Sequence, residues 1–161
     1  MKKIFGLVVM AMSMLFTANA MASTGVESVD VVTSTADYDG DYDGVISNVT
    51  MNGKSYSNED ATFTIESNVL ICDFPQIGKM PGTITVELPI SINEATGEIT
   101  ATPGTSAGIL TLKVGGEAPL YLDSLTNAKV ENGTLEFDMA VHGTYLSIIK
   151  FPASFHFKAP K

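Results

Sequence analysis

Residues 82–92 read GTITVELPISI, and this stretch decides the fold. Apolar and polar residues alternate along it, and the apolar positions are Ile84, Val86, Leu88, Ile90 and Ile92. Successive side chains of a β-strand point to opposite faces, so this pattern predicts a strand with one buried and one solvated face.

Pro89 interrupts the hydrogen bonding that this strand can make. Proline has no N–H to donate to a neighbouring strand, although the outward direction of its side chain leaves the apolar face intact. We therefore expect the strand to bulge or bend near residues 88–90, as a long strand does when it wraps around a barrel.

Alternating segments of the same kind follow one another along most of the chain, and none of them has a helical period. Asn132-Gly133 predicts a two-residue hairpin turn that pairs Val130 with Leu135. A three-residue turn at residues 143–145 would then set Phe137 opposite Phe151. With these turns, every apolar face lies on the same side of one sheet.

A long sheet with a single apolar face must bury that face on itself, by closing into a barrel or folding into a sandwich. Because almost all neighbouring strands are joined by hairpins, the barrel is favoured. We predict an all-β fold, a single antiparallel up-and-down barrel of about eight to nine strands.

The N-terminus has the features of an export signal. Two lysines precede an apolar run over residues 4–16, and small residues follow up to Ala20. This combination predicts a signal peptide over residues 1–20 that is cleaved after Ala20. The only cysteine, Cys72, lies far downstream, so no lipid-anchored cysteine is expected.

Two further segments make up the predicted mature protein. Residues 21–41 form a flexible leader that is polar and acidic, and residues 42–161 form the barrel domain. We expect the product to be periplasmic or secreted and to be a monomer.

The mature chain is strongly acidic. Removal of the two signal lysines leaves seven lysines, no arginine and eighteen acidic residues, a net charge of −11. Such a surface repels nucleic acids and anionic lipids, so neither a nucleic-acid partner nor stable membrane insertion is expected. The absence of arginine also removes the usual bidentate clamp for phosphate and carboxylate ligands.

A tandem Asp-Tyr-Asp-Gly repeat spans residues 37–44. Asp39, Asp41 and Asp43 match the opening of a calcium-binding loop, but its twelfth position holds Thr50 instead of glutamate. A predicted strand also follows where a helix would be needed. The alternatives are a weak calcium site and a solvated entry to the first strand; we expect the second, and no other metal site or cofactor.

Few side chains carry recognisable catalytic chemistry. Cys72 has no partner for an intramolecular disulfide, and we expect it to be a small buried hydrophobe. His142 and His156 fall on outward faces, with no acid or cysteine at metal-ligand spacing. The chain contains no serine-hydrolase, zinc-protease or phosphate-loop motif, and we expect it not to be an enzyme.

Four segments give the chain a resemblance to the calycin-like β-barrel family of exported bacterial proteins. They are Tyr42-Asp43-Gly44, residues 69–74, Pro81-Gly82-Thr83-Ile84 and residues 132–137. The resemblance covers roughly residues 42–157 and implies a lipocalin-like calyx for a small apolar ligand. The chain has no tryptophan, so it lacks the G-x-W signature of true lipocalins.

The inward faces of the predicted strands would line such a calyx. Thr126 lies with Ser124 and Ala128 on a face of small residues, which would either receive Phe137 or leave a hollow. The candidate ligand-binding residues are Val86, Leu88, Ile90, Leu122, Thr126, Phe137, Met139, Phe151 and Phe155.

These features favour an exported, soluble barrel that binds a small apolar ligand or acts as an accessory recognition domain. One alternative is a small outer-membrane barrel, for which eight strands would suffice. Another is a protein-interaction module with a packed, ligand-free core. An enzyme with its site in the calyx is disfavoured, because the predicted interior offers no acid or base.

Overall fold

Strand pairing in the structure follows the alternation that the sequence shows. This computed structural model describes residues 38–78, 80, 82–113, 115–145 and 149–159. The expected signal peptide (1–20) and most of the expected leader lie outside the described residues. The first strand begins at Gly40, two residues before the predicted start of the barrel domain.

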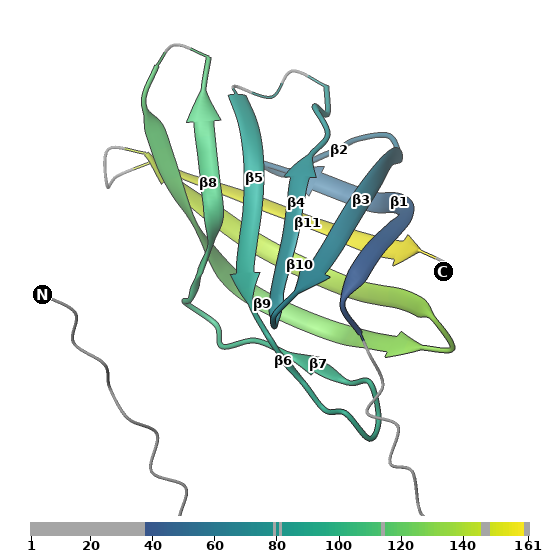
Figure 1. Ribbon diagram of the computed structural model, residues 1–161. Helices are drawn as coiled ribbons and strands as arrows, with labels where there is room; N and C mark the ends of the chain where they lie inside the picture. Colours follow the sequence, from purple (N-terminus) through teal and green to yellow (C-terminus); the bar gives the residue numbers. More distant parts are fainter. Residues whose placement is uncertain (1–37, 79, 81, 114, 146–148, 160–161) are drawn as a thin grey trace, which may run out of the picture. The chain divides into compact units, whose positions relative to one another are not determined.

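The described part of the chain contains strands and no helix (Figure 1). The strands are β1 (Gly40–Met51), β2 (Lys54–Ser55), β3 (Glu59–Glu66), β4 (Val69–Phe74), β5 (Gly82–Pro89), β6 (Ser91–Ile92), β7 (Ile99–Thr100), β8 (Ser106–Leu112), β9 (Glu117–Glu131), β10 (Thr134–Tyr145) and β11 (Ile149–Ala159). All their pairings are antiparallel.

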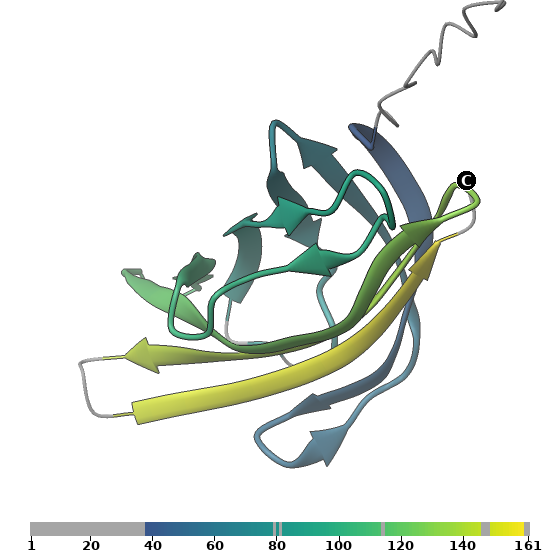
Figure 2. The same ribbon diagram turned by 90° about the horizontal axis from the view of Figure 1, so that it is seen from below.

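Eight of these strands close into a barrel, in the order β11-β10-β9-β8-β5-β4-β3-β1, and β1 pairs again with β11. The predicted antiparallel barrel is therefore confirmed. The short strand β2 adds to β1, and β6 and β7 form a separate hairpin. Figure 2 shows β9, β10 and β11 as long curved strands that run side by side along one wall.

The β6–β7 hairpin lies at one end of the barrel, at the bottom of Figure 1. The Val130 N–H of β9 donates a hydrogen bond to the Gly97 carbonyl oxygen at 2.8 Å, which ties the hairpin to β9, and Ile99 of the hairpin is buried. The opposite end, where β5 begins, is the end of the barrel that remains accessible.

β5 ends at Pro89, within the residues 88–90 where the sequence predicts a bulge or bend. Ile90 stands between β5 and β6, and its N–H donates to the Asn68 carbonyl oxygen at 2.9 Å instead of continuing the ladder. Val86, Leu88 and Ile90 nevertheless keep their apolar face, with exposed fractions of 3, 0 and 7 %. At this point the chain leaves the barrel and continues into the β6–β7 hairpin.

The Asn132-Gly133 turn lies where the sequence predicts it. Asn132 and Gly133 both have positive φ (52° and 77°), as a type I′ turn requires, and Val130 pairs with Leu135 across the hairpin. Asn52-Gly53 forms a similar turn between β1 and β2.

The predicted register of the last hairpin is wrong. Phe137 pairs with Phe157, and Phe151 pairs with Gly143. Gly143 is part of β10 and not of the turn, because its bare Cα makes room for Leu120, whose Cδ2 would lie 3.2 Å from a Cβ at this position. The observed partner of Phe137 lies six residues beyond the predicted one. Because side chains alternate between the two faces, a shift by an even number of residues leaves the predicted inward faces correct.

The predicted inward direction of Thr126 is also wrong. Thr126 pairs with Asp138 and Ser124 pairs with Ala140, both on the outer face, and Thr126 is exposed. Two irregularities in β9 cause this reversal, because each extra residue exchanges the two faces of the strand. Asn127, with φ of 53°, occupies the second one, and beyond it Ala128 is buried as expected.

The buried face of β5 provides a test of the fold. Val86→Asp places a carboxylate where it cannot be solvated, at a cost that exceeds the stability of an ordinary domain. We expect this variant not to fold, as measured by far-ultraviolet circular dichroism and urea titration.

Pro89→Thr is the matched control. Pairing of β5 with β8 ends at Val86, opposite Gly108, and position 89 pairs only with Val69 of β4. Proline has no N–H, so its replacement removes no backbone hydrogen bond that the wild-type residue donates. We expect its free energy of unfolding to lie within about 0.5 kcal/mol of the wild type. A folded Val86→Asp protein would contradict the assignment of faces.

Candidate ligand-binding site

Phenylalanine rings fill the part of the interior between β3, β10 and β11. The ring of Phe63 lies 5.0 Å from that of Phe137, edge to face, and 4.5 Å from that of Phe157. All three side chains have an exposed fraction of 0 %. Aromatic pairs at these separations each contribute about 0.5–1.5 kcal/mol beyond the burial of their surface. This part of the barrel is core and holds no ligand.

The accessible end of the barrel is hollow. An apolar pocket of about 100 Å³ opens there, with Met51, Tyr56, Met80, Ile84, Leu120 and Phe151 among its lining residues. We call this pocket the mouth. A smaller space of about 20 Å³ lies next to it, bounded in part by the same side chains and by Phe155.

Local structure explains how loop residues come to line the mouth. The segment after β4 folds over the end of the barrel, where the Met80 N–H donates to the Ile77 carbonyl oxygen at 3.2 Å and the Ile77 N–H points at the Met80 sulfur. Gly78 has φ of 55° and lies against the Tyr56 ring, so a Cβ at this position would collide with that ring. Ile77 and Met80 are both buried as a result.

The candidate ligand-binding residues divide into three groups. Phe151 lines the mouth, and Val86, Met139 and Phe155 line the smaller space beside it. Thr126 is outside the barrel. The remaining candidates are buried but border neither space, and they are Leu88, Ile90, Leu122 and Phe137.

Sequence reasoning missed several mouth residues. Ile84 could have been found, because it shares the apolar period of β5. Met80 and Tyr56 belong to no alternating segment, and only the fold of the loop around Gly78 brings them to the barrel end. Met51 precedes the Asn52-Gly53 turn, which carries it to the same end.

The mouth contains no ionised side chain. Asn52 is its one amide, and its other lining residues are apolar or aromatic. Such a surface contacts a ligand mainly through dispersion and the hydrophobic effect, with the Asn52 amide and the Tyr56 hydroxyl as its polar side-chain groups.

Cys72 is buried, as expected, at 2 % exposure. Burial raises the pKa of its thiol to about 12, and the neighbouring Asp73 carboxylate adds to the increase. The thiolate is the reactive form, so this cysteine is a packing residue.

Both histidines lie on the outer wall, as predicted, and each contacts an acid on the adjacent strand. His142 Nδ1 is 2.7 Å from Asp123 Oδ1, and His156 Nδ1 is 2.9 Å from Asp138 Oδ1. Asp138 also accepts a hydrogen bond from the Asn127 amide at 2.7 Å. These contacts tie β9, β10 and β11 together; within the described ranges, no three acidic, histidine or cysteine side chains gather as a metal site would require.

The three candidate calcium ligands of the tandem repeat, Asp39, Asp41 and Asp43, do not gather as a metal site would require. Asp41 and Asp43 lie on the outer face of β1, where they accept hydrogen bonds from Thr64 (2.7 Å) and Thr62 (2.6 Å) of β3. Asp39 accepts a hydrogen bond from the Ser67 N–H at 3.3 Å. The aspartates of the repeat therefore join β1 to β3 through hydrogen bonds, and they do not form a calcium loop.

Comparison with known proteins does not assign the chain to a family. No protein-family model matches the chain, and neither a curated protein nor a solved structure matches it. In the part of the chain that the structure describes, no helix has the length and apolar character to cross a membrane.

The Cys72 thiol gives a direct test of this packing. We expect a thiol reagent at pH 8 to modify it at least about 100-fold more slowly in the native protein than in urea, because burial and a raised pKa both suppress the thiolate. The release of the reagent's chromophore measures both rates. Rapid modification of the native protein would contradict the burial.

The outer-wall contacts predict a pH dependence of stability. The pKa of Asp138 is lowered, first by the Asn127 hydrogen bond and then by His156. A lowered pKa stabilises the folded state above the ordinary carboxyl value of about 3.9, and this contribution disappears as the pH falls through the lowered value. We expect Asp138→Asn to reduce the urea midpoint at pH 6 and to have a smaller effect near pH 3; an equal effect at both values would contradict the linkage.

Proposed function

We propose that this protein is an exported binding protein of the calycin-like kind, which receives one small apolar group in the mouth of its barrel. The observation that carries the proposal is the apolar pocket between Met51, Tyr56, Met80 and Phe151, open above a core that aromatic rings fill. Membership of the calycin-like family rests on the sequence resemblance and on the barrel architecture.

The volume of the mouth sets the size of the ligand. Pockets for drug-sized ligands measure about 300–1,000 Å³, whereas an apolar cavity of about 150 Å³ accepts benzene. At about 100 Å³, the mouth fits a small ring or the tip of an alkyl chain and not a whole lipid. Met51 and Met80 are unbranched and flexible, so the mouth can widen slightly around such a group.

The charge of the chain favours a neutral or cationic ligand. The full chain carries a formal charge of −9, and the proposed mature form carries more negative charge still. Fatty-acid carboxylates and phosphates would be repelled by this field, and the chain has no arginine to bind them.

Toluene provides a suitable probe, with the methionine methyl groups as reporters. Met51 and Met80 line the mouth and Met139 lines the space beside it. In a protein carrying ¹³C-labelled methionine methyls, we expect toluene to shift the Met51 and Met80 resonances saturably. Native mass spectrometry of the exported protein would show whether a natural ligand accompanies it.

Variants then test the location of binding. Ala153 borders both spaces, so Ala153→Leu should fill the mouth and weaken toluene binding at least about fivefold, whereas Ala95→Leu, in an exposed turn, should not. Phe151→Ala enlarges the mouth and should strengthen the binding of larger rings such as naphthalene. Shifts that never saturate, or that persist unchanged in Ala153→Leu, would overturn the proposal.

A further inference from the structure

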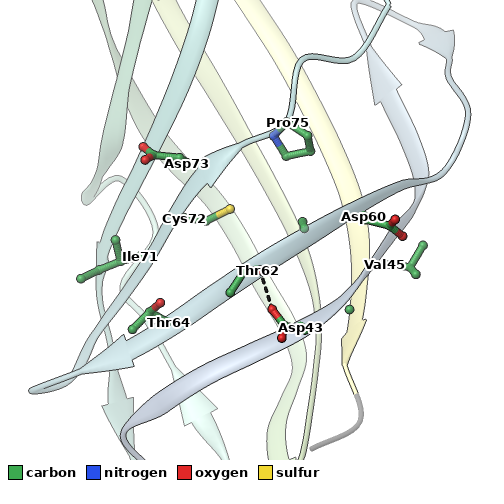
Figure 3. A pocket seen from close by; sticks show the side chains of 11 residues that line it. Asp43, Val45, Asp60, Thr62, Thr64, Ile71, Cys72, Asp73 and Pro75 are labelled. Carbon is green, nitrogen blue, oxygen red and sulfur yellow. Dashed lines mark hydrogen bonds between the residues drawn. The ribbon is translucent and has the colours of Figure 1, made fainter.

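Strands β3 and β4 separate soon after the hairpin that joins them. They pair at only three positions, from Glu66↔Val69 to Thr64↔Ile71. Beyond Thr64, β3 continues to pair with β1 as far as Glu59, and β4 continues to pair with β5 as far as Phe74. Figure 3 shows the two strands diverging from this point toward Asp60 and Pro75. We call the space between them the cleft.

The register explains why the strands separate. Continued pairing would set Thr62 opposite Asp73 and Asp60 opposite Pro75. Proline has no N–H, so the last of these pairs could not form its hydrogen bonds. The Asp73 carboxylate instead accepts a hydrogen bond from Thr85 at 3.0 Å, and that of Asp43 accepts one from Thr62 at 2.6 Å. Each strand is thus joined to its other neighbour.

Backbone groups line the cleft on both sides. Along an antiparallel strand, the N–H and C=O of alternate residues point to opposite neighbours. Since Thr64 pairs with Ile71 of β4, the N–H and C=O of Thr62 and Asp60 point the same way, into the cleft, where no described strand receives them. Such an open edge is a template for pairing with another extended chain.

The cleft is large enough for a peptide and is acidic. It measures about 900 Å³, and Asp43, Asp60 and Asp73 stand around it. Ala61 and Cys72 form part of its floor (Figure 3 labels Cys72). Lys158 of β11, opposite Val45, is engaged elsewhere, because its Nζ lies 2.9 Å from Glu136 Oε2. Among the described residues that line the cleft there is no lysine.

We propose that an extended, lysine- or arginine-bearing segment of a partner protein binds in the cleft as an added strand, antiparallel to β3. Its backbone would pair with Thr62 and Asp60, which is the mode of recognition known as strand addition. Its alternate side chains would point outward to the carboxylates and inward to the apolar floor. This site is separate from the mouth, and the inference does not depend on the small-ligand proposal.

Charge argues against the protein's own N-terminal segment as the occupant. Residues 21–37 carry Glu27, Asp30 and Asp37 and no basic residue. An acidic strand would place like charges beside Asp60 and Asp73, which costs binding energy.

The probe is an acetylated hexapeptide in which lysine and valine alternate, with a fluorescent label, followed by fluorescence anisotropy at low salt. We expect saturable binding that weakens as salt is added. Asp60→Asn/Asp73→Asn should weaken it about tenfold. The control Glu94→Gln/Glu117→Gln removes the same charge at exposed positions elsewhere and should change it less than twofold.

Two readouts report on backbone pairing without altering the protein. A hexapeptide N-methylated at the residues whose N–H groups would face β3 cannot donate to this strand and should not bind, whereas N-methylation at the other residues should be tolerated. Bound peptide should slow hydrogen exchange at the Thr62 amide at least about tenfold and leave the Phe63 amide, which faces β1, unchanged. Equal binding of a glutamate–valine hexapeptide, tolerance of N-methylation, an unchanged Thr62 amide or absence of binding would each overturn the proposal.

Discussion

The contacts of Phe63 with the rings on β10 and β11 are the interaction on which the barrel depends. Phe63 projects from β3, and its ring meets Phe137 and Phe157 from the strands on the far side of β1. Phe74 of β4 reaches the same cluster through Phe155, with ring centroids 4.9 Å apart. A single sheet has no second layer to cover its apolar face. In the closed barrel, these rings from facing strands of the same sheet cover one another instead.

The same cluster explains why the interior is divided. The five phenylalanines of this cluster occupy the width of the barrel near β3 and β11 and leave no space for a ligand. Toward the start of β5, the inward residues are smaller or more flexible, such as Ala153 and Met80, and the mouth remains between them. The barrel is thus a packed core with a shallow apolar opening, and not a deep calyx.

Local signals in the sequence predict the strands and turns of this fold well. The alternation in β5 and the two Asn-Gly turns each depend on neighbouring residues, so the sequence reveals them directly. Asn127 and Gly143 show where this fails. Asn127 adopts a left-handed conformation in mid-strand and Gly143 supports a close contact with Leu120, and both are consequences of tertiary packing. The mouth and the cleft depend on a loop and on a lost strand pairing, which no periodic pattern records.

The closure of the barrel by β1 and β11 determines when folding can be completed. The first and last of the described strands must meet, with Val45 opposite Lys158, so most of the sequence separates the partners. Pairings of such long range carry a large loop-closure entropy and form late. An emerging chain can form its hairpins one after another, but it cannot close the barrel until β11 is available. A barrel of this topology therefore stays open until its C-terminal strand has emerged.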